Sequence, residues 1–257
     1  MFVITVSHGK GGVAKTTTVL SLGAALTENN KRVLLVDVDP QNNLSVAVGL
    51  DPENQKQSIS NVLFNNMPIV ETIQKTMIGE LDVITSKSDL IHAEQLLPVR
   101  NNYQFILQQK LRDVANIYDF VIIDCSPFPG VVTLNAVVAS NLVIIPTIPE
   151  MLSVIAIRKT LNLIEIVKTH YNPSINFKIL ITLYNRRNRT HEEIIEKLNI
   201  KANRKIFKSI IGIDTKLRES QLMQKPVTLY APRSRSTTQY RELAQEVIDY
   251  VKERTKQ

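Results

Sequence analysis

Short runs of apolar residues alternate with amphipathic stretches along almost the whole chain. Six runs rich in Val, Ile and Leu predict buried strands, at residues 2–7, 32–37, 81–85, 120–124, 142–146 and 177–183. Between them, apolar positions recur at helical spacing in residues 15–29, 88–97, 103–117, 131–140 and 152–170. Continuously apolar strands separated by helices are typical of a parallel sheet buried on both faces. The pattern predicts an α/β fold: a mostly parallel, twisted sheet with helices on both faces.

The pattern is less regular after residue 183. A helix is expected near residues 191–198, a further segment at 216–223 and a closing helix at 239–252, whereas residues 226–235 are expected to form strand and loop. The closing helix has apolar residues at packing spacing, so we expect it to dock on the core rather than on a membrane. No repeat, low-complexity tract or Gly/Ser linker interrupts the sequence. We therefore expect residues 1–257 to form a single domain.

The composition is that of an ordinary globular protein. Of the 257 residues, 44% are hydrophobic and 21% are charged, which is ample material for one large core. No apolar run approaches the roughly 20 residues that cross a bilayer, and the first ten residues do not resemble a secretory signal. The single cysteine, Cys125, cannot form an internal disulfide. These features favour a cytoplasmic protein without a membrane partner.

Charge is divided unevenly between the two halves of the chain. Residues 1–130 carry 10 Lys and Arg against 13 Asp and Glu, whereas residues 131–257 carry 21 against 11. A basic C-terminal half is typical of a surface that binds a polyanion, although Lys-rich helical surfaces produce the same imbalance. Aromatic residues make up only 5% of the chain, with no Trp, which disfavours single-strand binding by base stacking.

A glycine-rich segment follows the first predicted strand directly. Residues 9–17 read GKGGVAKTT, and such a turn between a strand and a helix presents backbone N–H groups to an anion. Two motifs compete for it. Gly9-x-Gly11-x-x-Ala14, with an acid at Asp37 or Asp39, fits a dinucleotide fingerprint. The same residues followed by Lys15 and Thr16 fit a P-loop, except that alanine replaces its last glycine.

The Lys-Thr pair favours the P-loop. A nucleoside triphosphate site needs a cation for the β- and γ-phosphates and a hydroxyl for Mg²⁺, and a dinucleotide site needs neither there. The predicted strand at 120–124 ends in Val-Ile-Ile-Asp, so that Asp124 has the position of a Walker B acid. The two motifs together predict an ATP and Mg²⁺ site.

With these residues in view, the sequence resembles the ParA/MinD family of deviant-Walker ATPases, and its ParA/Soj branch most. The family loop KGGVGKTT corresponds to KGGVAKTT at residues 10–17, and its LLVDxDPQ motif to LLVDVDPQ at 34–41. The Walker B block corresponds to residues 121–130, followed by TLNA at 133–136. Similar blocks continue at 182–187, 225–227 and 240–246, so that the resemblance covers essentially the whole chain.

The resemblance implies a P-loop fold, a homodimer with ATP sandwiched between its subunits, and weak ATP hydrolysis that a partner stimulates. It assigns Lys10 to the nucleotide of the other subunit, Lys15 to its own phosphates and Asp39 to the attacking water. It places Thr16, Asp37 and Asp124 around Mg²⁺ and, loosely, Asn185 against adenine. The full set of expected nucleotide-binding residues is Gly9, Lys10, Gly11, Gly12, Val13, Ala14, Lys15, Thr16, Thr17 and Asn185.

Nonspecific DNA is the second partner that the resemblance implies. Relatives hold DNA with basic residues in this part of the chain, where Arg186, Arg187 and Arg189 lie. Residues 186–218 carry 10 Lys and Arg against 4 Asp and Glu. Such binding needs contacts with phosphates and no base code. A solvated basic face is the alternative.

The expected function is an ATPase that positions or partitions cargo through a ParB-like or other adaptor, in the cytoplasm and associated with the nucleoid. A plasmid or chromosome is the default cargo, and a protein complex or microcompartment is the alternative. A nucleotide-switched DNA-binding regulator is an alternative of another class.

Three departures from the family pattern bear on the site. Ala14 stands where the loop has a glycine, and its methyl group tolerates positive φ less well. Asn42 replaces a glycine after DPQ, which is a milder change because Asn tolerates left-handed geometry. Ser126 and Phe128 replace the usual Pro and Ser near the Walker B block, which puts coupling to the partner in question.

Overall fold

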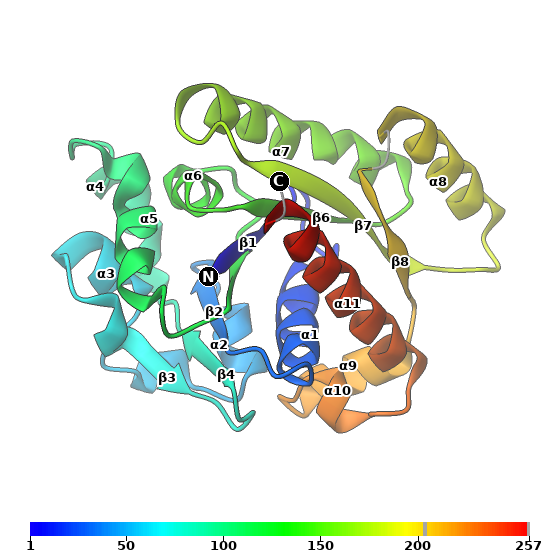
Figure 1. The fold of residues 1–257 in the computed structure, drawn as a ribbon, viewed down its shortest axis with the longest axis horizontal. Helices are drawn as coiled ribbons and strands as arrows, with labels where there is room; N and C mark the ends of the chain where they lie inside the picture. Colours follow the sequence, from blue (N-terminus) through cyan, green and yellow to red (C-terminus); the bar gives the residue numbers. More distant parts are fainter. Residues whose placement is uncertain (203–204, 256–257) are drawn as a thin grey trace.

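A single eight-stranded sheet organises the part of the chain that the structure describes, residues 1–202 and 205–255 of a computed structural model (Figure 1). Its strand order is β3-β4-β2-β5-β1-β6-β7-β8. The strands are β1 (Phe2–Val6), β2 (Val33–Val38), β3 (Ile73–Lys75), β4 (Leu81–Ile84), β5 (Phe120–Cys125), β6 (Leu142–Thr147), β7 (Asn176–Tyr184) and β8 (Ile206–Gly212). All neighbours pair in parallel except β3, which is antiparallel to β4 at the edge.

Helices cover both faces of this sheet. They are α1 (Lys15–Thr27), α2 (Asn43–Ala47), α3 (Ile59–Asn65), α4 (Ala93–Leu96), α5 (Ile106–Leu111), α6 (Val131–Val138), α7 (Met151–His170), α8 (Arg189–Ala202), α9 (Thr215–Leu222), α10 (Val227–Tyr230) and α11 (Arg235–Thr255). Short 3₁₀ turns occur at Pro52–Asn54, Ile69–Thr72, Ser88–His92, Tyr103–Phe105 and Arg112–Val114.

The alternation of side chains along each strand divides the core into two layers. In β2, Leu35 packs with the layer that contains α1 and α11, whereas Leu34 and Val36 pack with α3, α5 and α6. Further along the sheet, α7 and α8 cover the same face as α3 to α6. Successive strand residues point to opposite faces, so a strand buried on both sides must be apolar throughout.

The strand order brings the functional segments to one edge. Because β1, β2 and β5 are adjacent and parallel, the segments that follow them all leave the sheet at its carboxyl edge. Asp37 and Asp124 are direct partners in the β2–β5 register. In an open α/β sheet this edge is where ligands bind.

The predicted fold class and the six predicted strands are confirmed. The helices at 15–29, 131–140, 152–170 and 239–252 are also present, with small differences at their ends. The expected helix at 88–97 is a 3₁₀ turn followed by the single turn of α4, and the one at 103–117 is α5 between two 3₁₀ turns. The helix expected near 191–198 corresponds to α8, and the segment at 216–223, for which no structure was predicted, forms α9.

The strand expected within residues 226–235 was wrong. Pro226 lies at the N-cap of α10, and its carbonyl accepts hydrogen bonds from the N–H groups of Leu229 (3.1 Å) and Tyr230 (3.0 Å), which close one helical turn. The β-branched and aromatic residues there resemble a strand, but a proline with no N–H before them suits a helix start. Within residues 1–202 and 205–255, no helix is both long and apolar enough to cross a membrane.

Candidate nucleotide-binding site

The loop between β1 and α1 is shaped by two residues in left-handed conformation. Gly12 has φ 74°, and Ala14 has φ 65° and ψ 37° at the N-cap of α1. Among the described residues, no side chain caps this helix, and its first turn contains no acidic residue. The first N–H groups of α1 and the helix dipole therefore remain available to an anion.

A cavity of about 620 Å³ opens beside this loop. Gly11, Gly12, Ala14, Lys15, Thr16 and Thr17 line it from the loop and the start of α1. Asp39, Gln41, Asn43, Val46 and Ala47 line it from the segment after β2. Its size and the mixture of N–H groups, a lysine and carboxylates suit a nucleotide.

Lys15 extends across the loop mouth. It is buried, and its Nζ donates a hydrogen bond to the carbonyl oxygen of Lys10 at 3.2 Å. Burial lowers the pKa of Lys15, and the nearby carboxylates of Asp124 and Asp39 oppose that shift. An ammonium held out of water in this way gains from a phosphate placed next to it.

Thr16 and Asp124, both predicted Mg²⁺ ligands, lie in direct contact. The Thr16 hydroxyl donates to Asp124 Oδ2 at 2.6 Å, while the buried Asp124 Oδ1 has no hydrogen-bond partner among the residues that the structure describes. Burial and the neighbouring Asp37 raise the pKa of Asp124 well above its usual value. A hydroxyl and crowded carboxylate oxygens are ligands that Mg²⁺ prefers, so this donor set fits the ion.

Asp37 is a fully buried anchor behind the site. Its Oδ1 accepts from the N–H of Asp39 (3.1 Å), and its Oδ2 accepts from the N–H (3.0 Å) and hydroxyl (2.8 Å) of Ser45. Burial outweighs these bonds and raises the pKa of Asp37 to about 7. Asp37 thus positions the backbone of Asp39, and its part in the Mg²⁺ shell remains a prediction.

Asp39 itself lines the cavity, and its Oδ1 accepts from the N–H of Gln41 at 3.0 Å. Asn42 follows with φ 47°, so the left-handed geometry expected at this position is confirmed.

Not every predicted nucleotide ligand lines the cavity. Gly9 packs on α7, and Val13 is fully buried with its carbonyl accepting from Thr182 Oγ1 at 3.1 Å. Lys10 does not line the cavity either, and its Nζ is 3.4 Å from Glu150 Oε2. Asn185 is exposed and its Oδ1 accepts from the N–H of Arg187 (3.0 Å), so its contact with adenine remains a prediction.

The three arginines assigned to DNA lie together at one point of the surface. Arg186, Arg187 and Arg189 are all exposed and lie at the end of β7 and the start of α8. The loop is held by His191, whose Nδ1 accepts from the N–H of Asn185 at 3.2 Å. Because β7 is parallel to β1, this loop leaves the same edge of the sheet as the glycine-rich loop.

The far wall of the cavity was not predicted from the sequence. It is formed by residues of β7, β8, α9 and the loop between the last two, namely Leu183, Ile211, Ile213, Asp214, Leu217, Arg218 and Gln221. Gln221 Nε2 donates to Thr17 Oγ1 at 2.6 Å, which ties this wall to α1. The alternating pattern of residues 206–212 was the one signal available for β8, whose buried positions include Phe207, Ser209 and Ile211.

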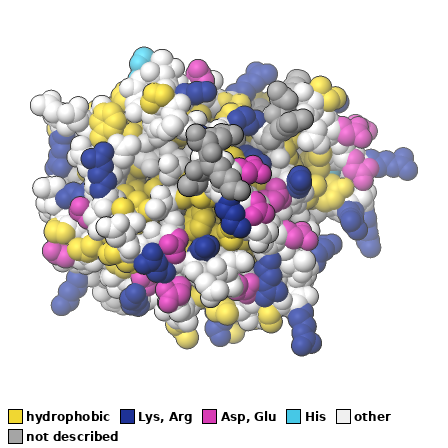
Figure 2. Space-filling view, in the orientation of Figure 1, with side chains coloured by type: hydrophobic (Ala, Val, Ile, Leu, Met, Phe, Trp, Pro, Cys, Tyr) yellow, Lys and Arg dark blue, Asp and Glu magenta, His cyan; other side chains and the backbone are white. Residues whose placement is uncertain are grey.

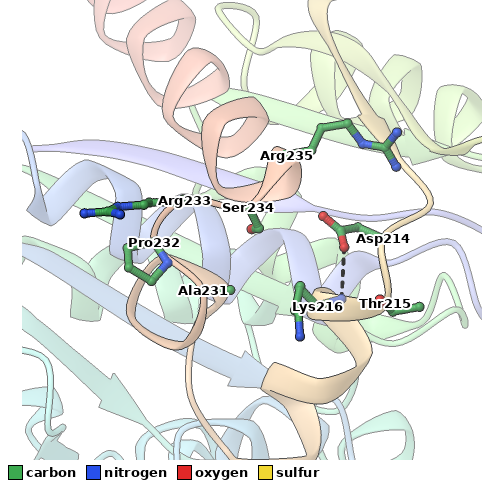
Figure 3. A pocket seen from close by; sticks show the side chains of 8 residues that line it. All are labelled: Asp214, Thr215, Lys216, Ala231, Pro232, Arg233, Ser234 and Arg235. Atoms are coloured by element: carbon green, nitrogen blue, oxygen red, sulfur yellow. Dashed lines mark hydrogen bonds between the residues drawn. The ribbon is translucent and has the colours of Figure 1, made fainter.

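A second hollow of about 590 Å³ lies beside Asp214 (Figure 3). Asp214 Oδ1 accepts from the N–H of Lys216 (3.0 Å) and its Oδ2 from that of Ser236 (3.1 Å). One carboxylate therefore caps both α9 and α11, with Arg235 next to it.

A parallel sheet with a glycine loop, a buried lysine, and a Thr–Asp pair at its carboxyl edge defines a P-loop nucleotide-binding protein. Residues 1–177 match the AAA domain family. The sporulation initiation inhibitor protein Soj of Bacillus subtilis is 35% identical over 246 residues, with 95% of this chain and 97% of Soj covered. The chromosome partitioning protein ParA of Myxococcus xanthus is 34% identical, covering 96% and 87%. The chain belongs to the ParA/MinD family of P-loop ATPases.

Solved structures agree with this assignment. A Mycobacterium smegmatis structure, described as a cobyrinic acid a,c-diamide synthase with bound ADP and magnesium, is 31% identical with a TM-score of 0.84, covering 98% of this chain and 96% of the other. MinD of Pyrococcus horikoshii, complexed with Mg-ADP, shares the fold at 22% identity with a TM-score of 0.76, covering 96% and 95%.

Proposed function

We propose that this chain is a cytoplasmic, weak ATP hydrolase that dimerises when ATP and Mg²⁺ are bound. In that state it binds nonspecific DNA in the nucleoid, and a ParB-like or other adaptor stimulates hydrolysis and release. The cargo is a plasmid or chromosome, which the chromosome partitioning relatives favour over a protein complex. The bound nucleotides and magnesium of the related structures support the choice of ligands.

The position of Lys10 is the observation that carries the dimer. Its side chain is about one-third exposed, does not line the cavity that Lys15 serves, and lies 3.4 Å from the exposed Glu150 Oε2. A lysine there can reach a phosphate of a facing subunit. A second ammonium near the γ-phosphate neutralises charge as the transition state forms.

Exposed apolar side chains near Lys10 support a dimer interface on the same face of the molecule. Phe128 is 62% exposed on the loop after β5, and Met151 (61%) and Leu152 (71%) begin α7 next to Glu150. Pro127 lies 3.9 Å from the position that a Cβ on Gly11 would have, so the Phe128 loop adjoins the glycine loop. Apolar residues exposed around a ligand site are typical of an interaction surface.

The residues of one subunit divide the chemistry between them. Lys15 and the loop N–H groups hold the phosphates, while Thr16 and Asp124 hold Mg²⁺, which supplies charge neutralisation at the phosphates when bound. Asp39, fixed at the cavity wall, orients water for in-line attack. Arg186, Arg187 and Arg189 contact DNA phosphates.

Light scattering at a fixed protein concentration tests the dimer. With ATP and Mg²⁺ the parent chain should change from monomer to dimer, and Lys10→Ala should stay monomeric while still binding nucleotide. Lys252→Ala is a matched control, because Lys252 also forms an exposed ion pair, 3.5 Å from Asp249. A parent that remains monomeric with ATP, or a Lys10→Ala variant that dimerises normally, contradicts the proposal.

A further inference from the structure

A buried histidine connects the glycine loop to α7. His8 is fully buried between β1 and the loop. The N–H of Lys10 donates to His8 Nδ1 at 2.9 Å, and His8 Nε2 lies 3.2 Å from the carbonyl oxygen of Ser153 in the first turn of α7. The imidazole ring therefore bridges the backbone of Lys10 and the start of a 20-residue helix.

The two contacts determine the form of the ring. Nδ1 accepts a hydrogen bond from a backbone N–H, so it carries no proton, and Nε2 must carry the proton that it donates to the Ser153 carbonyl. Burial, reinforced by the charge of Lys15, lowers the pKa of His8 to about 4. The ring is thus neutral at physiological pH and makes both hydrogen bonds at once.

The loop and the helix are also in close steric contact. A Cβ on Gly9 would lie 3.2 Å from the carbonyl oxygen of Ala156 and 3.2 Å from Lys159 Cβ. The same end of α7 carries the exposed Met151 and Leu152, and is preceded by Glu150, the ion-pair partner of Lys10. A displacement of this helix end would therefore act on the loop through a packed contact and a hydrogen-bonded ring.

We infer that His8 is a positioning residue that couples the first turn of α7 to Lys10. A facing subunit that docks on Met151 and Leu152 presses on α7, and His8 transfers that contact to the Lys10 backbone, orienting its side chain toward the facing nucleotide. The inference rests on the proposed dimer. It adds that the His8 ring links the dimer face to Lys10, alongside the Gly9 contact with α7 and the Lys10–Glu150 ion pair.

Two substitutions test the two hydrogen bonds of His8 separately. In His8→Asn, the amide oxygen takes the position of Nδ1 and can still accept from Lys10, but the side chain is too short to reach Ser153. In His8→Gln, the amide nitrogen takes the position of Nε2 and can donate to Ser153, but no acceptor faces Lys10. Ser153→Ala is the matched control: it removes a buried hydroxyl that has no hydrogen-bond partner within residues 1–202 and 205–255, and it leaves the Ser153 carbonyl in place.

Each variant is compared with the parent for ADP affinity and for the ATP-dependent dimerisation constant. We expect both His8 variants to weaken dimerisation about 3- to 10-fold, the effect of one hydrogen bond, with ADP affinity unchanged. Ser153→Ala should match the parent in both measurements. Parent-like dimerisation in either His8 variant overturns the coupling, as does a parallel loss of ADP affinity or an equal effect of Ser153→Ala.

The proposed dimer and this inference fail differently. If the parent does not dimerise with ATP, the proposed function is wrong, whereas a parent that dimerises beside unaffected His8 variants removes only the coupling. If a variant does not fold, ¹⁵N NMR of the histidines in the parent chain remains decisive. His8 should be the neutral Nε2–H tautomer between pH 6 and 8, with signals that shift when ATP and Mg²⁺ are added. The other tautomer, or unchanged signals on dimerisation, contradicts the coupling.

Discussion

Ala14 occupies a backbone conformation that favours glycine. At φ 65° and ψ 37° a Cβ costs roughly 1–2 kcal/mol, yet this residue lines the nucleotide cavity and begins α1. Strain of this kind persists where the surrounding structure enforces it, and it is common at ligand sites. The departure from the family loop that is visible in the sequence is therefore a strained position in the structure.

Replacing Ala14 by glycine should relieve that strain. We expect Ala14→Gly to raise the free energy of unfolding by about 1 kcal/mol, since the relief exceeds the added chain entropy of glycine. Urea unfolding measures the difference. Asn42→Gly is the control, because Asn42 is also left-handed, at φ 47°, but tolerates that geometry, and it should change stability less. A destabilised Ala14→Gly variant would contradict the inference that the backbone at Ala14 is strained.

At the scale of elements, one carboxylate caps two helices: α9, which lines the cavity, and α11. Asp214 caps α9 and α11 through the N–H groups of Lys216 and Ser236. Burial alone would raise the pKa of Asp214, but these hydrogen bonds and the nearby Arg235 outweigh it and lower the pKa. The N–H groups of the two helices therefore stabilise the ionised form of the Asp214 carboxylate.

Loss of this double cap should destabilise the protein. Asp214→Ala removes both acceptors and is expected to cost about 2 kcal/mol, roughly 1 for each cap, and Asp214→Asn about half of that. Because the folded-state pKa is lowered, the stabilisation is present above the usual carboxyl pKa and is lost as the pH falls through the folded-state value. Urea unfolding should show a smaller difference in the free energy of unfolding between the parent and Asp214→Ala below pH 4 than at pH 7. Asp249→Ala, which removes an exposed carboxylate, is the control, and an equal effect there would argue against the cap.

The sequence predicted elements well where one local rule decides them. The strands before Lys10 and ending at Asp124 are continuous apolar runs, and the loop motif lies within nine consecutive residues. β8 was missed because the other strands were predicted from continuous apolar runs, and Lys208 and Ser209 interrupt the run at 206–212; α10 resembled a strand. The cavity wall at Ile211 and Gln221 could not be predicted, because it depends on strand order that brings segments about 200 residues apart together.

At the scale of the whole molecule, basic residues are spread widely over the surface. Figure 2 shows Lys and Arg side chains scattered over one face with acidic ones among them. The excess of positive charge is concentrated in one segment of the sequence: residues 186–218 carry 10 Lys and Arg against 4 Asp and Glu. The proposed DNA contact therefore depends on where arginines cluster, not on the total charge.

DNA binding should be electrostatic and independent of sequence. If about 4–6 phosphates are neutralised per dimer, log K should fall with log salt at a slope of roughly −4 to −5. Charge reversal at Arg186, Arg187 and Arg189 should weaken binding to all duplexes alike and flatten the slope, as measured by fluorescence anisotropy. Reversal at Lys168, Lys208 and Lys252, which are exposed elsewhere, alters the net charge equally and should weaken binding less. Preference for one operator, or an affinity insensitive to salt, would favour a sequence-specific regulator instead.

The central claim is that hydrolysis within an ATP-bound dimer sets how long the protein stays on DNA. The most direct test records ATP turnover and DNA residence time together in the parent, Asp39→Ala and Asp124→Ala. Asp39→Ala should bind ATP and dimerise but turn over about 10²-fold more slowly, and remain on DNA correspondingly longer. Asp124→Ala should lose both ATP binding and turnover, because Thr16 loses its carboxylate partner. If Asp39→Ala hydrolyses ATP at the parent rate, or slows turnover without a longer residence on DNA, the account is contradicted.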